Sequence, residues 1–532
     1  MADVLATQLL KRLGSLENQR QVWESHWQEI ADYVVPRKAD ITKKRTQGDK
    51  RTELVFDGTA IHAAELLSAS LHGMLTNSSV RWFSLRFRDK ELDMNDEAKE
   101  WLESVEDVMY QAFNRSNFQE QVHELYHDLI CFGTGVMFIE KDPEYTLRFQ
   151  TRHCSEVFLS EDSNGRVDTV FRRFKMPARA VIDRFGDQVD SKIQKKAEQN
   201  PYEMITLVHA VYPRHERDVI KVTSENKPFA SVYLDPDSRT ILSESGFDEF
   251  PYVAPRFLKA SFEIGYGRSP AMTALPDIKM LNKMSEVTIR SAQKQVDPPL
   301  MVPDDGFMLP IRTVPGGLNF YRSGTRDKIE PLTIGANTPL GLNMEEQRRK
   351  AIQSAFYVDQ LILSQGPQMT ATEVMQRTEE KMRLLGPVLG RLQAELLQPL
   401  INRSYNLMTR DRLFAAAPDF MKNTGIEIEY VSPLAKAQKS GDIQAAMRLF
   451  ELMGPLAQID QSVIDYIDAD GLAKYLMQTL SVPATTIRGE QQVAEIREQR
   501  AEQMQAEAQR QEQMETAEAM GAAAPMMKLM QQ

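Results

Sequence analysis

Cysteines and long apolar runs are scarce in this sequence, which excludes two broad classes of protein. Its 532 residues include only two cysteines, Cys131 and Cys154. No disulfide framework can form, so a reducing compartment fits best, and we expect both to be packed thiols. No stretch of about 18 consecutive apolar residues occurs, so we predict no transmembrane helix and no membrane partner. The polar segment Met1–Trp27 predicts an amphipathic helix and lacks the features of a secretory signal.

Basic residues are also fewer than acidic residues in this sequence. The 64 lysines and arginines are outnumbered by 75 aspartates and glutamates, which gives a formal net charge of −11. A protein that holds DNA by its phosphates usually presents a basic face. The charge balance therefore argues against a repressor or a packaging histone. It does not argue against a passage through which DNA slides, because tight phosphate binding would stall that movement.

Several sequence signatures of catalysis are missing. No Gly-x4-Gly-Lys-Ser/Thr loop occurs, so the chain is not expected to be an ATP-driven motor. No Gly-x-Ser-x-Gly elbow of a serine hydrolase occurs either. Gly133-Thr134-Gly135 is too short for a dinucleotide-binding fingerprint and instead predicts a turn from a helix into a strand. We therefore predict no enzyme activity, no catalytic residue, no cofactor and no bound metal.

One short motif supports a competing hypothesis. The segment His123-Glu124-Leu125-Tyr126-His127 matches the pattern in which two histidines one helical turn apart bind zinc and the glutamate is a general base. The extended form of the motif fails, because Ile130 stands where glycine would follow. A third ligand would have to be one of the nearby glutamates, which are Glu140, Glu144 and Glu156. A zinc metallopeptidase is therefore the alternative function.

The same segment also has a purely structural interpretation. Val122, Leu125 and Leu129 recur at helical spacing. They predict the buried face of an amphipathic helix, with the two histidines near its polar edge.

Length and periodicity predict a mainly helical α+β protein. A chain of 532 residues is too long for one compact core, so we expect two to four domains. Before about Asn117 the pattern is helical and includes helices at Thr59–Leu75 and Asp96–Phe113. From Thr134 to Phe250, short segments rich in β-branched and aromatic residues alternate with turn signals, which predicts a β-rich subdomain. The expected strands are Val136–Glu140, Tyr145–Thr151, Asp168–Phe174, Met204–Tyr212, Asp218–Thr223 and Ala230–Leu234.

A long helix is predicted after this subdomain. Ser269 supplies a capping hydroxyl, and Pro270 is favoured at the first helical position. The helix should end at Val296, because the segment Asp297-Pro298-Pro299 follows and a residue before proline avoids the helical region. Pro276 in the second turn predicts a kink near the start.

This helix carries a stripe of basic residues. At 100° per residue they fall within about 60° of one another. They are Lys279, Lys283, Arg290 and Lys294. In a monomer such a stripe is ordinarily a solvated face, whereas in a ring it would line a pore or pair with a neighbouring subunit.

A small β-containing insert is predicted between this helix and the next. The segment Asp297–Gly341 is rich in proline and glycine and holds two strand-like pieces, Leu318–Tyr321 and Ile329–Thr333. A second helix is predicted from Asn343, which can form a capping arrangement with Glu346, to about Leu363. Two helices that bracket a compact insert predict an antiparallel stalk with a tip.

Ser364–Met369 then interrupts the helical pattern, and Thr370–Glu373 is a capping box. A helix from there to Asp411 would be about 60 Å long, and Pro387 and Pro399 predict one or two kinks in it. Its apolar face would consist of Leu385, Leu389, Leu392, Leu396 and Leu400. A strand at Ile426–Val431 and helices to about Arg500 follow. The tail rich in Gln, Glu, Ala and Met predicts a self-packing helix or disorder.

Short segments spread in order along most of the chain resemble one protein family. They are Phe56–Ala60, Leu66–Leu75, Trp82-Phe83, Phe132–Gly135, Tyr266–Pro270, Leu275–Lys279, Leu281-Asn282, Asp297–Leu300, Met369–Val374, Gly386-Pro387, Gln398–Leu400, Tyr430–Leu434, Val482-Pro483 and Ile487-Arg488. Each is unspecific alone. The ordered set, from about Phe56 to Arg500, resembles the head-to-tail connector, or portal, of short-tailed bacteriophages.

The resemblance implies a portal fold with a wing, a two-helix stem, a clip and a crown. The implied divisions are the wing (residues 1–266), stem helix 1 (267–297), the clip (298–341), stem helix 2 (342–363), a tunnel loop (364–369), a long kinked wing helix with a return strand (370–433), a helical crown (434–500), and a tail (501–532) that is a helical barrel or disordered.

The resemblance also implies a ring of twelve subunits at one capsid vertex, through which double-stranded DNA is packaged and ejected. The implied partners are the terminase packaging motor, tail and adaptor proteins, the major capsid protein and the scaffolding protein. The implied location is the virion, after assembly in the host cytoplasm. The tunnel loop implied to face DNA consists of Ser364, Gln365, Gly366, Pro367, Gln368 and Met369.

Overall fold

The structure is a computed structural model, and it describes most of the first 420 residues and shorter parts of the rest. The described residues are 2–43, 45–46, 48–79, 81–87, 95–218, 220–221, 223–301, 310–311, 320, 330–331, 338–361, 385–418, 420, 448–449, 451–452, 468–479, 492–507 and 509–510. The chain divides into two compact units. The first is Met1–Trp82 with Met109–Arg412, and the second is Phe83–Val108 with Leu413–Gln532.

The N-terminal helices of the first unit form because apolar residues recur at the helical period. They are α1 (Ala2–Val34), the 3₁₀ turn η1 (Pro36–Lys38), α2 (Thr59–Leu75) and α5 (Phe118–Phe132). The helix predicted at Thr59–Leu75 is confirmed with the same bounds. Helices α2 and α5 pack against each other, and Leu67 of α2 and Leu125 of α5 are both fully buried. Burying a leucine side chain contributes about 1.5–3 kcal/mol.

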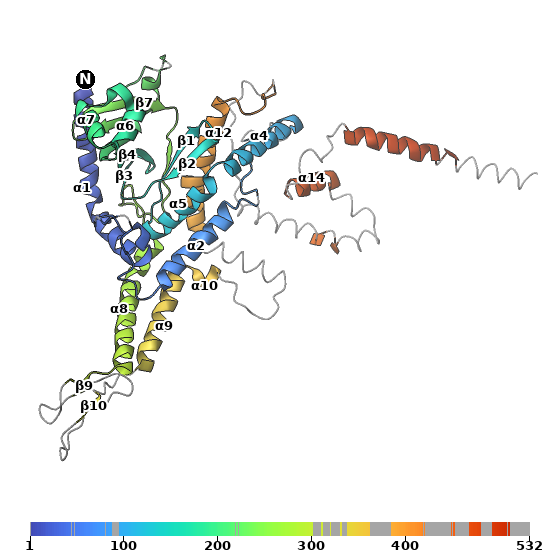
Figure 1. The fold of residues 1–532 in the computed structure, drawn as a ribbon. Helices are drawn as coiled ribbons and strands as arrows, with labels where there is room; N and C mark the ends of the chain where they lie inside the picture. Colours follow the sequence, from blue (N-terminus) through green and yellow to red (C-terminus); the bar gives the residue numbers. More distant parts are fainter. Residues whose placement is uncertain are drawn as a thin grey trace, which may run out of the picture. The chain divides into compact units, whose positions relative to one another are not determined.

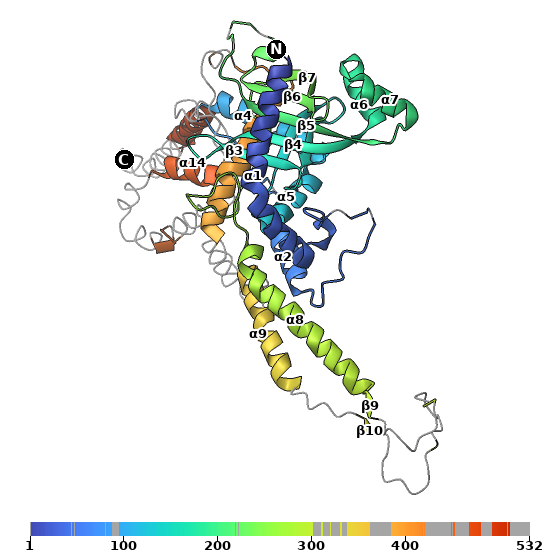
Figure 2. The same cartoon turned by 90° about the vertical axis from the view of Figure 1, so that its left-hand side faces the viewer.

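A five-stranded antiparallel sheet forms most of the β-rich part, in the order β3-β4-β5-β6-β7. Its strands are β3 (Val157–Glu161), β4 (Val167–Pro177), β5 (Met204–Pro213), β6 (Phe229–Asp235) and β7 (Thr240–Phe247). Alternate residues of a strand face opposite sides of the sheet. On one side Phe171 and Val208 pack against Leu9 and Leu13, so α1 covers that face (Figures 1 and 2).

Two short helices cover the other face of this sheet. They are α6 (Ala178–Phe185) and α7 (Ser191–Gln199), joined through η2 (Gly186–Gln188). Val181 and Ile193 from these helices pack against Phe174 and Leu207 of the sheet. Neither helix was among the elements predicted from the sequence.

The strand predicted at Asp218–Thr223 is wrong. Its described residues lie in a loop and a turn that lead to η3 (Ser224–Asn226). The side chain of Asp218 accepts a hydrogen bond from the backbone of Ile220 at 3.1 Å, and Ile220 is 90% exposed. A local aspartate turn therefore replaces the strand, since aspartate readily bonds to the backbone two residues on.

A smaller sheet has the order β2-β1-β8, with β1 (Met137–Asp142), β2 (Thr146–Thr151) and β8 (Tyr252–Val253). The turn predicted at Gly133-Thr134-Gly135 is confirmed, because it joins α5 to β1. Gly133 has φ of 79° and donates its N–H to the carbonyl of Leu129 at 2.9 Å, so it caps α5 in the left-handed conformation.

Two antiparallel helices of the first unit, α8 (Pro270–Val296) and α9 (Thr338–Ala355), lie side by side and project from the rest of that unit (Figures 1 and 2). We call this pair the stalk. The predicted bounds of α8 are confirmed, and the helix continues through Pro276.

The second helix departs from its predicted bounds. It begins at Thr338 rather than Asn343, because Pro339 preorganises an earlier first turn. It is also interrupted at Tyr357, where φ is 59°, before α10 (Val358–Leu361).

Little of the predicted insert lies within the described residues. Beyond the stalk, β9 (Leu300–Met301) pairs with β10 (Glu330–Pro331) in antiparallel fashion. The strand predicted at Leu318–Tyr321 falls almost wholly outside the described residues.

The first unit ends in an irregular helix. Residues 385–392 are α-helical, η4 (Gln393–Leu397) is a π-helical turn, and α12 (Gln398–Arg410) follows. The apolar face predicted here is confirmed, because its five leucines are at most 6% exposed. The irregularity has a covalent cause. Pro399 has no N–H to donate to the carbonyl of Glu395, and the N–H of Gln398 bonds five residues back, to Gln393.

Three longer helices are described in the second unit. Helix α4 (Asp96–Arg115) belongs to this unit up to Val108, and the other two are α14 (Ala469–Thr479) and a helix over residues 492–507. The predicted strand at Ile426–Val431, most of residues 434–500 and the tail after residue 510 lie outside the described residues. Within the part of the chain that is described, no helix is long and apolar enough to cross a membrane.

Candidate functional site: the stalk and its anchor

The stalk begins at a buried serine that ties α8 to the end of α5. The hydroxyl of Ser269 accepts a hydrogen bond from the backbone N–H of Met272 at 3.0 Å, which caps the helix. The same hydroxyl donates to the carbonyl of Cys131 at 2.8 Å. Ser269 is fully buried. One side chain therefore satisfies an orphan N–H of α8 and fixes the position of the helix start against α5.

Two glycines let the backbone before α8 pass directly over the end of α5. A Cβ at Gly133 would overlap the carbonyl of Gly267, and a Cβ at Gly267 would crowd Gly133 in return. The N–H of Gly267 donates to the hydroxyl of Thr134 at 2.8 Å, and the N–H of Phe257 donates to the carbonyl of Gly133 at 3.0 Å. This crossing requires residues without side chains.

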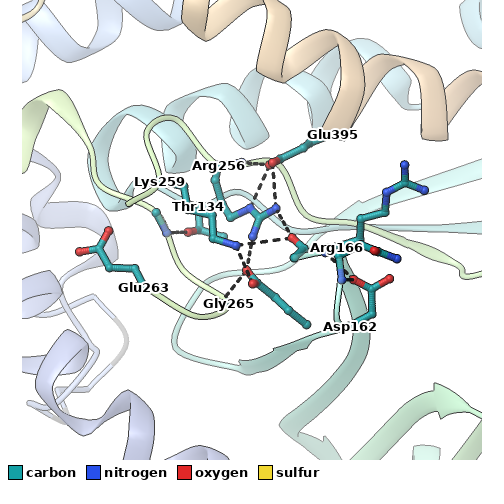
Figure 3. A network of polar contacts seen from close by, with 12 residues as sticks. Thr134, Asp162, Arg166, Arg256, Lys259, Glu263, Gly265 and Glu395 are labelled. Carbon is teal, nitrogen blue, oxygen red and sulfur yellow. Dashed lines mark hydrogen bonds and ion pairs between the residues drawn. The ribbon is translucent and has the colours of Figure 1, made fainter. Parts of the chain in front are cut away.

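A buried arginine joins three distant segments just before the stalk. Arg256 donates through Nε to Glu395 Oε2 at 2.9 Å and through Nη2 to Glu395 Oε1 at 2.8 Å. Its Nη1 is paired with Glu161 at the end of β3, and its Nη2 also donates to the carbonyl of Gly165 at 3.0 Å. Figure 3 shows Arg256 and Glu395 facing each other, with Glu395 on the irregular helix.

The second carboxylate of this cluster has further donors. Lys259 Nζ donates to Glu161 Oε2 at 2.6 Å, and the N–H of Gly265 donates to Glu161 Oε1 at 2.9 Å (Figure 3). We call Arg256, Glu161, Glu395 and Lys259 the anchor network. The side chains of Arg256 and Glu161 are only 3% and 7% exposed, while Glu395 is 22% exposed.

Two cations balance two carboxylates in the anchor network, and backbone groups satisfy much of the rest. Buried ion pairs of this kind add little net stability as a whole, but removing one partner leaves a buried charge uncompensated and costs about 3–5 kcal/mol. The network therefore acts mainly as a geometric lock. It fixes β3, the chain before α8 and the π-helical turn to one another.

Polar contacts also hold the two stalk helices together. Thr288 on α8 donates its hydroxyl to Glu345 Oε1 on α9 at 2.6 Å, and Arg348 Nη1 donates to Asp277 Oδ1 at 2.7 Å. Glu345 is 3% exposed. The predicted cap at Asn343 does not form, because Asn343 lies inside α9, where Oδ1 accepts from Gln347 Nε2 at 3.4 Å.

The loop before α2 contacts both stalk helices. Asn282 of α8 is buried, and its Oδ1 accepts from the backbone N–H groups of Phe56 and Asp57 at 2.8 and 3.3 Å. Asp57 Oδ2 in turn accepts from Arg349 Nε of α9 at 3.0 Å. Burial opposes the charge of Asp57, but hydrogen bonds from Thr59 and Arg349 outweigh it and lower its pKa.

The predicted basic stripe lies on the exposed side of α8, and carboxylates already accompany most of it. Lys283 and Arg290 both pair with Glu286, at 3.0 and 2.6 Å, and Lys279 pairs with Glu29 at 3.2 Å. Lys294 is exposed near the end of the helix. Exposed pairs such as these contribute about 0–1 kcal/mol and are screened by salt, so the side chains remain available to other anions.

A family model covers nearly the whole of this chain. The model for "Bacteriophage head to tail connecting protein" matches residues 6–487. The chain belongs to this family. The match includes both the anchor network and the stalk, so it does not rest on one motif.

Curated relatives of this connector agree with the family model. The chain is 33% identical over 514 residues to the "Probable portal protein" of Bordetella phage BPP-1, covering 94% of this chain and 91% of the relative. It is 32% identical over 517 residues to the "Portal protein" of Salmonella phage epsilon15, covering 95% and 93%. The "Portal protein" of Enterobacteria phage T3 is 22% identical, covering 73% of this chain and 71% of the relative.

Among solved structures, a chain titled "Neck of empty GTA particle computed with C6 symmetry" aligns over 77% of the connector and 95% of that chain. The sequence identity is 13% and the TM-score 0.37. A TM-score of this size does not establish a shared fold.

The zinc motif of the alternative hypothesis is taken up by structural contacts in this connector. His127 is only 4% exposed rather than at a polar edge, and burial lowers its pKa to about 4. Burial opposes the charge of Glu124, but hydrogen bonds from Arg37 and Lys38 outweigh it and lower its pKa to about 2, which makes it a poor base. No group of three or more His, Cys, Asp or Glu side chains within the described residues is placed to hold a metal. The structure gives the metallopeptidase hypothesis no support.

Other predicted features of the connector meet different outcomes. Cys131 and Cys154 are buried free thiols, as predicted, and burial raises the pKa of each. The buried positions of Val122, Leu125 and Leu129 are confirmed. The segment Ser364–Met369 lies outside the described residues.

Sequence reasoning missed the anchor network. Arg256 is separated from Glu161 by 95 residues and from Glu395 by 139. No periodicity links residues at such distances. The only available signal was a lone arginine after Pro255 in an otherwise apolar stretch, and that does not identify a partner.

Proposed function

We propose that this protein forms a ring at one capsid vertex and that the ring is the channel through which double-stranded DNA is packaged and later ejected. The observation that carries the proposal is similarity over more than nine-tenths of the chain to two phage portal proteins. The two-helix stalk, fixed at its base by buried contacts, supports it. A wall of such stalks around an axis would form a tube, and the chain would act as a conduit and not as an enzyme.

The parts of the chain take proposed roles in this ring. The stalk would be the stem, and at 1.5 Å per residue its 27-residue helix α8 is about 40 Å long. Residues 298–341 would be the clip that meets the terminase motor during packaging and tail or adaptor proteins afterwards. Residues 1–266 would be the wing and 370–433 its long helix and return strand. Residues 434–500 would be the crown, and the tail after Ala501 a helical barrel or a disordered segment. The major capsid and scaffolding proteins would surround the ring in the virion, after assembly in the host cytoplasm.

Charge supports passage rather than capture of DNA. A net charge of −11 per subunit, repeated around a ring, repels a polyanion and prevents tight general binding. The basic stripe of α8 would provide local contacts, either to DNA in the channel or to the neighbouring subunit. Replacing Lys279, Lys283, Arg290 and Lys294 with glutamine separates the two cases, because a channel role changes packaging alone while an interface role weakens ring assembly.

The segment Ser364–Met369 is proposed to be the tunnel loop that narrows the channel. Its side chains are uncharged, so it can touch DNA without binding phosphates tightly. Changing Gln365 and Gln368 to lysine should impair packaging while rings still assemble, because new cations would hold the phosphates. Packaging at the normal rate in this double variant would remove the tunnel role.

Negative-stain imaging together with native mass measurement of the purified chain tests the proposal directly. Rings with a central hole and a mass near twelve times the 60.7 kDa subunit are expected. A compact monomer that persists at high concentration would contradict the proposal. Rings of another subunit number would keep the channel and correct only the stoichiometry.

A further inference from the structure

A basic cavity lies in the wing, away from the stalk and its anchor. Its volume is about 400 Å³, and residues of both sheets and of α6 line it. The five-stranded sheet contributes the face that α6 and α7 cover, and the three-stranded sheet contributes β1, β2 and β8. Pockets for small ligands in proteins start at about this size, about 300 Å³.

Four arginine side chains line the cavity from three elements. Arg148 and Arg152 come from β2 and the residue after it, Arg172 from β4, and Arg184 from α6. One lining carboxylate, Glu140 of β1, is placed among them. Positive charge therefore exceeds negative charge in a partly enclosed space, in a chain that is acidic as a whole.

Neighbouring groups satisfy only part of this cluster. Arg172 Nε donates to Glu156 Oε2 at 2.9 Å, and Arg184 Nη2 donates to the hydroxyl of Tyr233 at 3.0 Å. Glu140 Oε1 accepts from Gln150 Nε2 at 2.6 Å. Within the described residues, the buried Nε of Arg152 has no hydrogen-bond partner.

The electrostatics of the cavity point the same way. Burial, reinforced by the charge of Arg172, lowers the pKa of Arg152. Burial also raises the pKa of Glu140, although Arg148, Arg184 and Arg152 oppose the rise. The single lining carboxylate is thus held in a setting that disfavours its charge.

The floor of the cavity is closely packed and adds no charge. His209 stacks on Tyr233 with ring centroids 4.0 Å apart, and its Nε2 lies 3.0 Å from the hydroxyl of Ser231. Its other ring nitrogen lies 3.4 Å from the hydroxyl of Tyr252. Burial keeps the pKa of His209 well below its usual range, so the ring stays neutral.

We propose that this cavity binds a phosphate-type oxyanion, either free phosphate or the phosphates of a small molecule. A carboxylate has two oxygens and is saturated by one or two guanidinium groups. A phosphate group carries about −1.5 to −2 charge and at least three acceptor oxygens, which suits cations arriving from three directions. Arginine is also the side chain whose planar fork best matches such oxygens. The site lies within one subunit, so it depends neither on ring formation nor on DNA passage.

Isothermal titration of the full-length protein with inorganic phosphate and with pyrophosphate, at fixed ionic strength in chloride, tests the assignment. Binding of one anion per subunit with a Kd below about 1 mM is expected. Pyrophosphate should bind more tightly if the site accepts a phosphate chain, whereas equal or weaker binding would indicate a site for single phosphate. A glutamate-rich hexapeptide and a short DNA duplex serve as competitors. Displacement by the peptide at lower concentration than phosphate would overturn the phosphate assignment, and so would binding of the duplex without binding of phosphate.

Matched variants locate the binding. Arg148→Gln and Arg184→Gln alter exposed side chains at the cavity rim, so both proteins should fold. Each should weaken phosphate binding about tenfold, and Arg152→Gln should weaken it further if its melting temperature is unchanged. Lys195→Gln removes an exposed cation of α7 that does not line the cavity and should leave the Kd unaltered. Equal Kd values for Arg148→Gln, Arg184→Gln and the unmodified protein would overturn the proposal.

Discussion

Arg256 and Glu395 form a two-pronged ion pair across 139 residues of sequence, and the backbone N–H of Arg256 donates to the same carboxylate at 3.0 Å. Three donors of one residue therefore converge on one side chain. The pair connects the chain that enters α8 with the helix that returns after the stalk. Movement of the stalk base relative to that helix would break several charge-assisted hydrogen bonds at once.

Removing the positive partner should destabilise the subunit strongly. Arg256→Gln leaves Glu161 and Glu395 without their central cation, and we expect a loss of about 3–5 kcal/mol. Lys141→Gln is the control, because Lys141 also pairs over a long sequence separation, with Asp411, but is 56% exposed. Its expected cost is about 1 kcal/mol or less. The melting temperatures of the two variants, measured on unassembled subunits, test this prediction. Equal decreases would contradict the role of the anchor network as a geometric lock.

The glycine crossing gives a steric prediction. Gly133→Ala should cost more than about 3 kcal/mol, since the new Cβ meets the carbonyl of Gly267 as well as adopting a positive φ. Gly48→Ala is the control, because φ there is 89° but nothing lies within 4 Å of the added carbon. It should cost only about 1 kcal/mol. If both variants melt at the same temperature, the close approach does not constrain the fold.

The buried His127 makes stability depend on pH in the acid direction. Its folded pKa of about 4 lies below the ordinary histidine value of about 6.5, so the unfolded chain takes up the proton first as the pH falls. This contribution is intact above pH 6.5 and is lost progressively towards pH 4. Between pH 7 and 5 it amounts to about 2 kcal/mol. His127→Gln should therefore lose less unfolding free energy than the unmodified protein between pH 7 and 5, by that amount. The unfolding free energies are measured by denaturant titration at each pH. An equal loss in both proteins would show that the imidazole is not held neutral.

Asn282 should control the loop before α2 locally. Asn282→Ala leaves the N–H groups of Phe56 and Asp57 without their acceptor, at a cost of about 1–3 kcal/mol. Faster hydrogen exchange at these two amides is the specific measurement. Asn200→Ala is the control, because Asn200 accepts from the N–H of Tyr202 in the same way but is exposed. Protection at Phe56 that survives the Asn282 change would remove the role assigned to this amide.

The sequence was most informative where a local signal sufficed. Ser269, Pro270 and the prolines after Asp297 set both ends of α8, because capping and proline sterics act within a few residues. The leucine face near residue 392 was predictable for the same reason. The start of α9 was not, since the Asn343 signal competed with an earlier proline, and the earlier one prevailed.

The site was less predictable than the helices that carry it. The anchor network depends on three segments that meet only after the sheet, α5 and the irregular helix have packed. The strand expected at Asp218–Thr223 failed because its composition is suited to a strand while the aspartate favours a turn. Helices α6 and α7 were overlooked because each is short and lies between strong strand patterns.

The π-helical turn at Gln393–Leu397 also sets the rotational phase of everything after it. A turn with one extra residue shifts the following helix by about 100° relative to an uninterrupted α-helix. Leu400 and Ile401, which follow the turn, are both buried. Deleting one residue from the turn would rotate both side chains by about 100° away from the contacts they now make. The number of residues in this turn is therefore as constrained as the side chains that follow it.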